Sequence, residues 1–135
     1  MRNDRSVSYL ENNSIAKFTI HLPPISKKNS QQIVRRKDGT PCIIPSKKYK
    51  EYEAKTAPFM PRVSTIDRTV NVKAVFYMQT HRIVDLVNLQ EALLDVLVKH
   101  RILDDDNSRI VVSMDGSRVE YDKENPRTEV EITRA

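Results

Sequence analysis

The spacing of the apolar residues changes near position 80, and this change constrains the fold more than any other feature of the sequence. From Thr69 to Met78 apolar residues recur at every second position, which is typical of a β-strand with one buried face. From Leu86 to about His100 they recur every three or four residues, which predicts an amphipathic helix. Because this helix is apolar on two sides, we expect it to pack on the sheet and on a second surface, such as a partner subunit.

Strands are also predicted near both ends of the chain. Residues 16–22 alternate between apolar and polar side chains until Pro23-Pro24 ends the pattern, and residues 129–133 alternate in the same way. Residues 1–14 are polar, so we expect them to be frayed. Residues 15–135 are then expected to form one domain, since a domain commonly spans roughly 100–200 residues.

Short turn signals place the remaining elements. Two Asp-Gly pairs, at 38–39 and 115–116, each separate two apolar runs, so each pair predicts a β-hairpin. A shorter helix is expected from a cap at Ser46 to about Ala57, where prolines follow. The order of strands, helix, strand, helix, hairpin and strand predicts an α+β fold, in which two main helices pack on a mixed sheet.

The composition excludes several classes of protein. The single cysteine, Cys42, cannot form an intramolecular disulfide or a cysteine-based zinc site, and we expect it to be a small buried apolar residue. Two glycines are too few for a glycine-rich phosphate loop, so no nucleotide cofactor is expected. No apolar run approaches the ~18 residues of a membrane span, and no secretory signal is recognised. We therefore expect a cytoplasmic protein.

The charge of the chain is divided unevenly between its two halves. Residues 1–60 carry a net charge of +7, whereas residues 61–135 carry −2. A basic half suits a polyanion such as nucleic acid, although a merely solvated surface is an open alternative. The basic residues that we expect to contact phosphates surround the first hairpin and the start of the first helix: Lys27, Lys28, Arg35, Arg36, Lys37, Lys47, Lys48 and Lys50.

The acidic residues of the second half gather around the predicted long helix. Asp85, Glu91 and Asp95 share one helical face with Asn88, and the run 104–106 of three aspartates follows the helix. Crowded carboxylates repel one another, and a hard cation such as Mg²⁺ compensates them through oxygen ligands. The alternative is structural, since aspartates are common on solvated helix faces and in capping loops.

The segment from His81 to Leu97 resembles the signature of the RusA-type Holliday-junction resolvases. In that family a basic lead-in precedes Asp-x-Asp-Asn-Leu and a helix that ends in Leu-Asp-x-Leu. The resemblance continues at residues 102–107, where the family has paired aspartates, and more weakly at residues 23–30 and 125–127.

This resemblance implies a small homodimeric endonuclease that depends on Mg²⁺, with Mn²⁺ as a substitute. Such enzymes make paired symmetric nicks in four-way DNA junctions during recombination and repair, in bacteria and in phage-infected cells. Asp85 matches the first catalytic aspartate, Asp106 matches the last, and Asp105 lies beside it. Arg82 is the basic residue that we expect nearest the scissile phosphate.

The chain departs from the family pattern at two positions. Val87 stands where the second aspartate is expected, and Glu91 stands where the family has a lysine. One hypothesis is that Glu91 reaches back one helical turn and supplies the missing catalytic and metal-binding carboxylate. The alternative is a catalytically impaired accessory protein that binds branched DNA. A third possibility, outside nucleic acids, is a protein whose lysines only keep it in solution.

Overall fold

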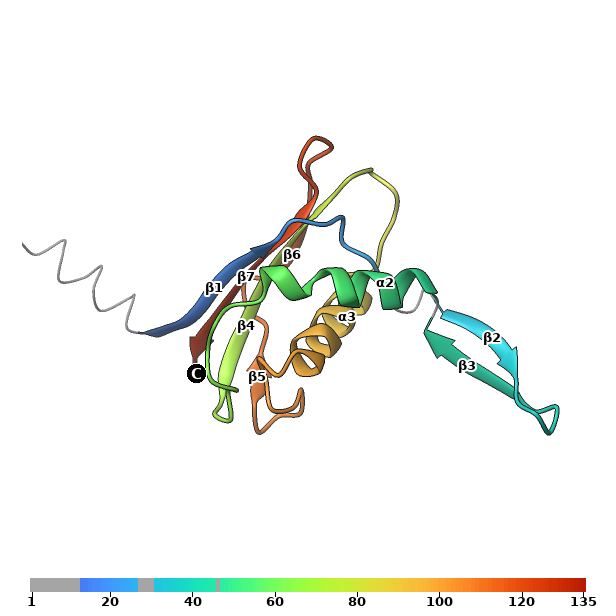
Figure 1. The fold of residues 1–135 in the computed structure, drawn as a ribbon. Helices are drawn as coiled ribbons and strands as arrows, with labels where there is room; N and C mark the ends of the chain where they lie inside the picture. Colours follow the sequence, from blue (N-terminus) through green and yellow to red (C-terminus); the bar gives the residue numbers. More distant parts are fainter. Residues whose placement is uncertain (1–12, 27–30, 46) are drawn as a thin grey trace, which may run out of the picture.

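The structure is a computed structural model that describes residues 13–26, 31–45 and 47–135 (Figure 1). Its main sheet contains β1 (Ser14–Ile20), β4 (Val70–Met78), β5 (Val111–Ser113), β6 (Arg118–Tyr121) and β7 (Arg127–Arg134). A second sheet consists of β2 (Gln31–Arg35) and β3 (Pro41–Pro45). The helices are α2 (Lys47–Lys55), α3 (Leu86–Lys99) and the 3-10 turn η2 (Ala57–Phe59). The predicted α+β fold, with a mixed sheet and two main helices, is confirmed.

The main sheet is mixed because its two central strands have different partners. Strand β7 pairs in antiparallel fashion with both β1 and β4. Along its other edge, β4 pairs in parallel with β5 and β6. The strand predicted from Thr69 to Met78 is therefore confirmed as a central strand, and the predicted first strand lies two residues earlier than expected.

Helix α3 covers one face of this sheet and forms the core with it. The alternating residues of β4, from Val70 to Phe76, have relative exposures of 2% or less on that face. They form one cluster with Leu89, Leu93 and Leu97, which recur once per helical turn. Burying a leucine side chain of this kind contributes about 1.5–3 kcal/mol, so this seam dominates the stability of the domain.

The second surface that α3 contacts is helix α2 of the same chain. The Tyr49 hydroxyl donates a hydrogen bond to the Ala92 carbonyl oxygen over 3.4 Å. Nearer the end of α3, His100 Nε2 lies 2.8 Å from the Glu53 carbonyl oxygen and 3.1 Å from the hydroxyl of Thr56. These contacts join the carboxyl ends of the two helices and fix the point at which the chain leaves α3.

The hairpin predicted at Asp115-Gly116 is wrong. Strands β5 and β6 do not pair with each other; instead, both follow the same edge of β4 in the same direction. The Asp-Gly pair makes an interruption in one edge strand, where Gly116 has a φ of +88°. Side chains replace the missing ladder hydrogen bonds, since Ser117 Oγ accepts one of 3.0 Å from the Ala74 backbone N–H.

The hairpin predicted at Asp38-Gly39 is confirmed and projects away from the main sheet and from α3 (Figure 1). Gly39 takes a φ of +88° in the turn, and Asp38 accepts hydrogen bonds from the backbone and hydroxyl of Thr40. These hydrogen bonds hold the pKa of the Asp38 carboxyl below its usual value, and the one from the Thr40 hydroxyl has the largest effect. Cys42 lies on this hairpin and is only partly buried, so the prediction of a buried cysteine is wrong because the hairpin has no core around it.

Other predictions concern boundaries and membrane insertion. Helix α3 runs from Leu86 to Lys99, as expected, whereas α2 ends at Lys55 and is followed by η2. The predicted cap at Ser46 and the polar segment 1–12 lie outside the described residues. In the part of the chain that the structure describes, no helix has both the length and the apolar character needed to cross a bilayer.

Candidate functional site

Asp85 lies at the amino terminus of α3, at the end of the loop that follows β4. Its backbone is extended, and its Oδ1 accepts a hydrogen bond of 3.0 Å from the Val87 backbone N–H. This is the geometry of a helix N-cap, in which one carboxylate oxygen satisfies a free backbone donor. The side chain is exposed, so its second oxygen remains available to a ligand. The helix dipole also favours negative charge at this position.

The acidic loop, residues 104–107, begins where α3 ends in a Schellman turn. The Ile102 backbone N–H donates to the Leu97 carbonyl oxygen over 2.8 Å, and that of Arg101 donates to Val98 over 3.0 Å. Arg101 takes the left-handed φ of +61° that this turn requires. A further hydrogen bond of 2.9 Å, from the Asp104 N–H to the Ile66 carbonyl oxygen, holds the start of the loop against the segment before β4.

Hydrogen bonds within the acidic loop orient the Asp105 carboxylate. Its Oδ1 accepts from the Asp106 backbone N–H over 2.7 Å, and its Oδ2 accepts from the side-chain amide of Asn107 over 3.0 Å. The amide oxygen of Asn107 in turn accepts from the Arg109 N–H over 2.9 Å. The loop is therefore organised by its own side chains before any ligand binds.

The charge of Asp95 reaches Asp106, as the grouping of acidic residues around the helix in the sequence suggested. The pKa of the Asp106 carboxyl is raised, first by partial burial. A hydrogen bond with Asp105, the charge of Asp105 and the charge of Asp95 raise it further. On α2, burial raises the pKa of the Tyr49 hydroxyl, and the charges of Glu53 and Asp95 raise it further. The Leu-Asp-x-Leu pattern around Asp95 was the signal in the sequence, but it does not show which loop the carboxylate meets.

Asp85 and Glu91 lie nearer the amino end of α3 than Asp95 does. At about 1.5 Å per residue, Asp85 is roughly 15 Å from Asp95 along the helix axis, and Glu91 is exposed between them. Among the described residues, no three His, Cys, Asp or Glu side chains are grouped closely enough to hold one metal ion. The charges of Asp105 and Asp95 thus act on Asp106, whereas the structure does not bring Asp85 and Glu91 into one ligand shell with these residues.

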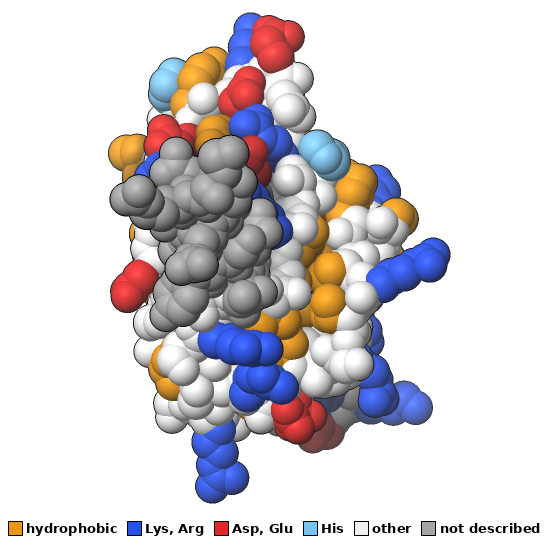
Figure 2. Space-filling view, turned by 90° about the vertical axis from the view of Figure 1, so that its left-hand side faces the viewer, with side chains coloured by type: hydrophobic (Ala, Val, Ile, Leu, Met, Phe, Trp, Pro, Cys, Tyr) orange, Lys and Arg blue, Asp and Glu red, His pale blue; other side chains and the backbone are white. Residues whose placement is uncertain are grey.

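The predicted phosphate-binding residues lie on exposed parts of the hairpin and of α2. Arg35 donates to the Gly39 carbonyl oxygen over 2.9 Å, and Arg36 lies 3.7 Å from the Cys42 sulfur, so both are held near the hairpin turn with Lys37. The exposed lysines at the start of α2 are Lys47, Lys48 and Lys50, and Lys27 and Lys28 lie outside the described residues. On the face shown in Figure 2, Lys and Arg side chains are spread over several separate places, some at the outline and some within the visible face.

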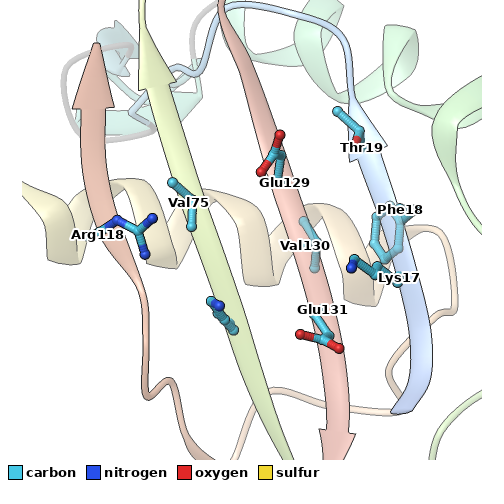
Figure 3. A pocket seen from close by; sticks show the side chains of 9 residues that line it. Lys17, Phe18, Thr19, Val75, Arg118, Glu129, Val130 and Glu131 are labelled. Atoms are coloured by element: carbon cyan, nitrogen blue, oxygen red, sulfur yellow. The ribbon is translucent and has the colours of Figure 1, made fainter. Parts of the chain in front are cut away.

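A shallow hollow on the opposite face of the sheet does not belong to this site. It measures about 380 Å³, and α3 lies behind the strands that form it (Figure 3). The cations of Lys17, Lys73 and Arg118 stand there beside the carboxylates of Glu129 and Glu131. Because these charges nearly balance, the hollow lacks the excess of one sign that a phosphate or a metal ion would need.

Comparison with known proteins identifies the family. The family model described as Endodeoxyribonuclease RusA matches residues 21–133, from the end of β1 to the last residues of β7. A search of curated protein sequences finds no significant match. The match includes the N-cap aspartate, α3 and the whole acidic loop. Because it covers most of the chain, this protein belongs to the RusA endodeoxyribonuclease family.

Proposed function

We propose that this protein is a metal-dependent endonuclease that resolves four-way DNA junctions by paired symmetric nicks. The observation that carries the proposal is the family match, which spans Asp85 and the acidic loop. We further propose that residues 15–135 form the nuclease domain and act as a homodimer in the cytoplasm of a bacterial or phage-infected cell. A two-fold dimer suits a four-way junction, since two identical sites then face two equivalent strands.

The donor set fits a hard divalent cation. Asp105 and Asp106 are adjacent carboxylates, and the pKa of Asp106 is raised by partial burial, by Asp105 and by Asp95, so a cation would relieve repulsion that is present without one. Mg²⁺ prefers oxygen ligands and is often held by only one or two carboxylates together with substrate phosphates. Asp105 and Asp106 would hold it, and Asp85 and Glu91, which the structure does not bring into the same ligand shell, are proposed as further ligands from their positions in the family pattern. When bound, the metal supplies an activated hydroxide and stabilises charge on the phosphoryl oxygens.

The chain's own residues bind and orient the DNA. Exposed basic side chains on the hairpin and at the start of α2 contact phosphates, which positions a duplex arm without reading its sequence. Arg82 lies three residues before Asp85 and is exposed, so we propose that it binds the phosphate next to the one that is cut. The hydrogen bond from Val87 holds the Asp85 carboxylate in one orientation while the strand is placed.

A second candidate function is binding of branched DNA without cleavage. The observation that favours it is Val87, which is 57% exposed at the position where the family pattern has an aspartate and offers no ligand. Glu91 is exposed one helical turn further on, and its carboxylate is the proposed replacement. The two functions differ in whether the wild-type protein cuts DNA when a metal ion is supplied.

The test is incubation of the purified protein with a labelled four-way junction in Mg²⁺, Mn²⁺ or EDTA. We expect paired nicks that disappear in EDTA, in Asp85→Asn and in Glu91→Gln, while Glu124→Gln, an exposed glutamate outside the site, cuts normally. Tight junction binding without nicks in either metal would establish the accessory function instead. Cleavage that persists in Glu91→Gln would show that Glu91 is not the replacement ligand.

A further inference from the structure

A cleft lined partly by aromatic rings lies between the carboxyl ends of β4 and β6 and the loop that leads to Asp85. It measures about 370 Å³, within the roughly 300–1,000 Å³ typical of ligand pockets. The His81 and Tyr121 rings stack in this cleft with centroids 3.7 Å apart and planes inclined by 22°. Its remaining lining comes from Met78, Thr80, Arg82, Ile83, Val84, Val119 and Glu120.

The strand register explains why these rings are found at this end of the sheet. Tyr121 is paired with Met78, and Val119 is paired with Phe76, so both side chains of β6 lie on the face that carries α3. That face is covered at Phe76 but opens at the end of the sheet, where Tyr121 is 42% exposed and Val119 is 37% exposed. A fold that needed Tyr121 only for its core would not leave so much of the ring in water.

The stack leaves one surface free for a further ring. One face of the His81 imidazole lies on Tyr121, so the exposed part of this side chain is its other face and its edge. Ile83, also in the lining, is 96% exposed, so its apolar side chain is free to pack on a ligand. A planar, partly apolar ligand would bury these surfaces and extend the stack to three layers.

We propose that this cleft holds one unstacked nucleobase of the DNA strand that enters the site at Asp85. The inference rests on the proposed function and adds to it a base-binding subsite made by His81 and Tyr121. Aromatic rings bind bases of any sequence by stacking, because every base has a planar π-face. The bound base must be unstacked, because a base that is stacked between its neighbours in a duplex cannot enter the cleft.

The charges around the cleft suit the phosphates on either side of such a base. Arg82 supplies an exposed cation, and its backbone N–H is held by the Thr80 hydroxyl over 3.4 Å. The one carboxylate in the lining, Glu120, is paired with Arg118 at 2.7 Å, so it adds little free negative charge. Asp85 lies at the end of the same loop, which places the base within a few nucleotides of the phosphate that is cut.

The experiment is photocrosslinking in EDTA, where binding occurs without hydrolysis. A four-way junction with 5-iodouracil at the crossover, and a second one with it in the middle of an arm, are irradiated with the full-length protein, and adducts are located by mass spectrometry. A single-stranded oligonucleotide with 5-iodouracil is irradiated in the same way, and dissociation constants for the junctions, a plain duplex and this oligonucleotide are measured for wild type, Tyr121→Leu and Tyr121→Phe. Val112→Ala, at an exposed position of neighbouring β5, is the control, and circular dichroism confirms folding.

We expect crossover adducts on Tyr121 or His81, and a loss of about fivefold or more in junction affinity for Tyr121→Leu but not for Tyr121→Phe or the control. Adducts that map elsewhere, or an unchanged affinity in Tyr121→Leu, would overturn the subsite. The proposed function is tested separately by the preference for junction over duplex. Adducts on Tyr121 from a single-stranded iodouracil oligonucleotide, without any preference for junctions, would support the base subsite and overturn junction resolution.

Discussion

Asn71 and Asp115 are joined through the Asn71 side-chain amide, which bridges the interruption between β5 and β6. Its Oδ1 accepts from the Asp115 backbone N–H over 2.8 Å, and its Nδ2 donates to the Asp115 carbonyl oxygen over 3.2 Å. One side chain thus stands where a backbone ladder would otherwise be. The Ser113 hydroxyl also donates to Asn71 Oδ1, so we expect Asn71→Ala, which removes all three hydrogen bonds, to lower the free energy of unfolding by about 1–3 kcal/mol. Urea denaturation measures this, and Thr69→Ala, at the exposed position just before the same strand, should change it by less than about 0.5 kcal/mol.

The turn at Gly116 is expected to be sensitive to any side chain. Its φ of +88° strains L-residues, and an added Cβ would lie 3.0 Å from the Lys73 Cδ atom. We expect Gly116→Ala to destabilise the protein by about 1–2 kcal/mol. Gly39→Ala is the matched comparison, because Gly39 has the same φ with open space around it. If Gly116→Ala lowers the free energy of unfolding more than Gly39→Ala does, and adding Lys73→Ala restores part of the loss, the difference is due to the contact with Lys73.

The Schellman turn after α3 carries an arginine where glycine is the usual residue. Arg101 adopts a φ of +61°, which a side chain disfavours. We expect Arg101→Gly to raise the free energy of unfolding by about 1 kcal/mol, whereas Arg101→Ala, which retains the Cβ, should not. Thermal unfolding of the three proteins measures the difference. Equal stability of the two variants would show that the turn is not strained.

Asp106 is expected to make stability fall as the pH rises. Because burial and the neighbouring carboxylates raise its pKa above the ordinary 3.8, the folded state binds more protons than the unfolded state just above that value. Stability therefore decreases as the pH rises from about 3.8 through the raised pKa, and the full loss is present above it. Asp106→Asn should melt at a higher temperature than wild type at pH 7, and the gap should close near pH 3. Asp104→Asn is the control, and a lower melting temperature of Asp106→Asn at pH 7 would contradict this explanation.

The hairpin is expected to affect DNA binding and not stability. Lys37 lies at its exposed turn, so Lys37→Ala should remove about one phosphate contact and reduce the slope of log Kd against log salt by about 1. The melting temperature should stay the same, because the hairpin lies away from the core (Figure 1). Lys123→Ala, in the loop before β7, should leave the slope unchanged. Equal slopes for wild type, Lys37→Ala and Lys123→Ala would show that the hairpin turn does not contact DNA phosphates.

The elements with strong local patterns were predictable from the sequence. Strand β4 and helix α3 follow periods of two and of three to four residues, and no distant contact overrides them. The second hairpin failed because the Asp-Gly signal is also local, whereas the choice of partner strand depends on Asn71 and Ser117, about 40 residues apart in sequence. A turn signal shows that the chain bends and does not show which strand it returns to.

The candidate site was predicted as a set of residues and not as an arrangement. Aspartates around α3 were identified from their spacing, yet the position of the acidic loop against the domain depends on the turn at Arg101 and on the hydrogen bond from Asp104 to Ile66. Both are tertiary features that helical spacing does not contain. For the same reason Cys42 was expected in a core, although its strand belongs to a hairpin that lies outside one.

The interrupted edge of β4 also limits how copies of this protein can associate. An uninterrupted outer strand offers free N–H and C=O groups to the edge of another sheet and invites uncontrolled growth of sheets between molecules. Here that edge is divided into strands of three and four residues by a glycine turn, so it presents no long row of regular donors and acceptors. Strand pairing between copies is therefore disfavoured at this edge, and among the described strands the longer open edge is the opposite one, where the seven-residue β1 pairs only with β7.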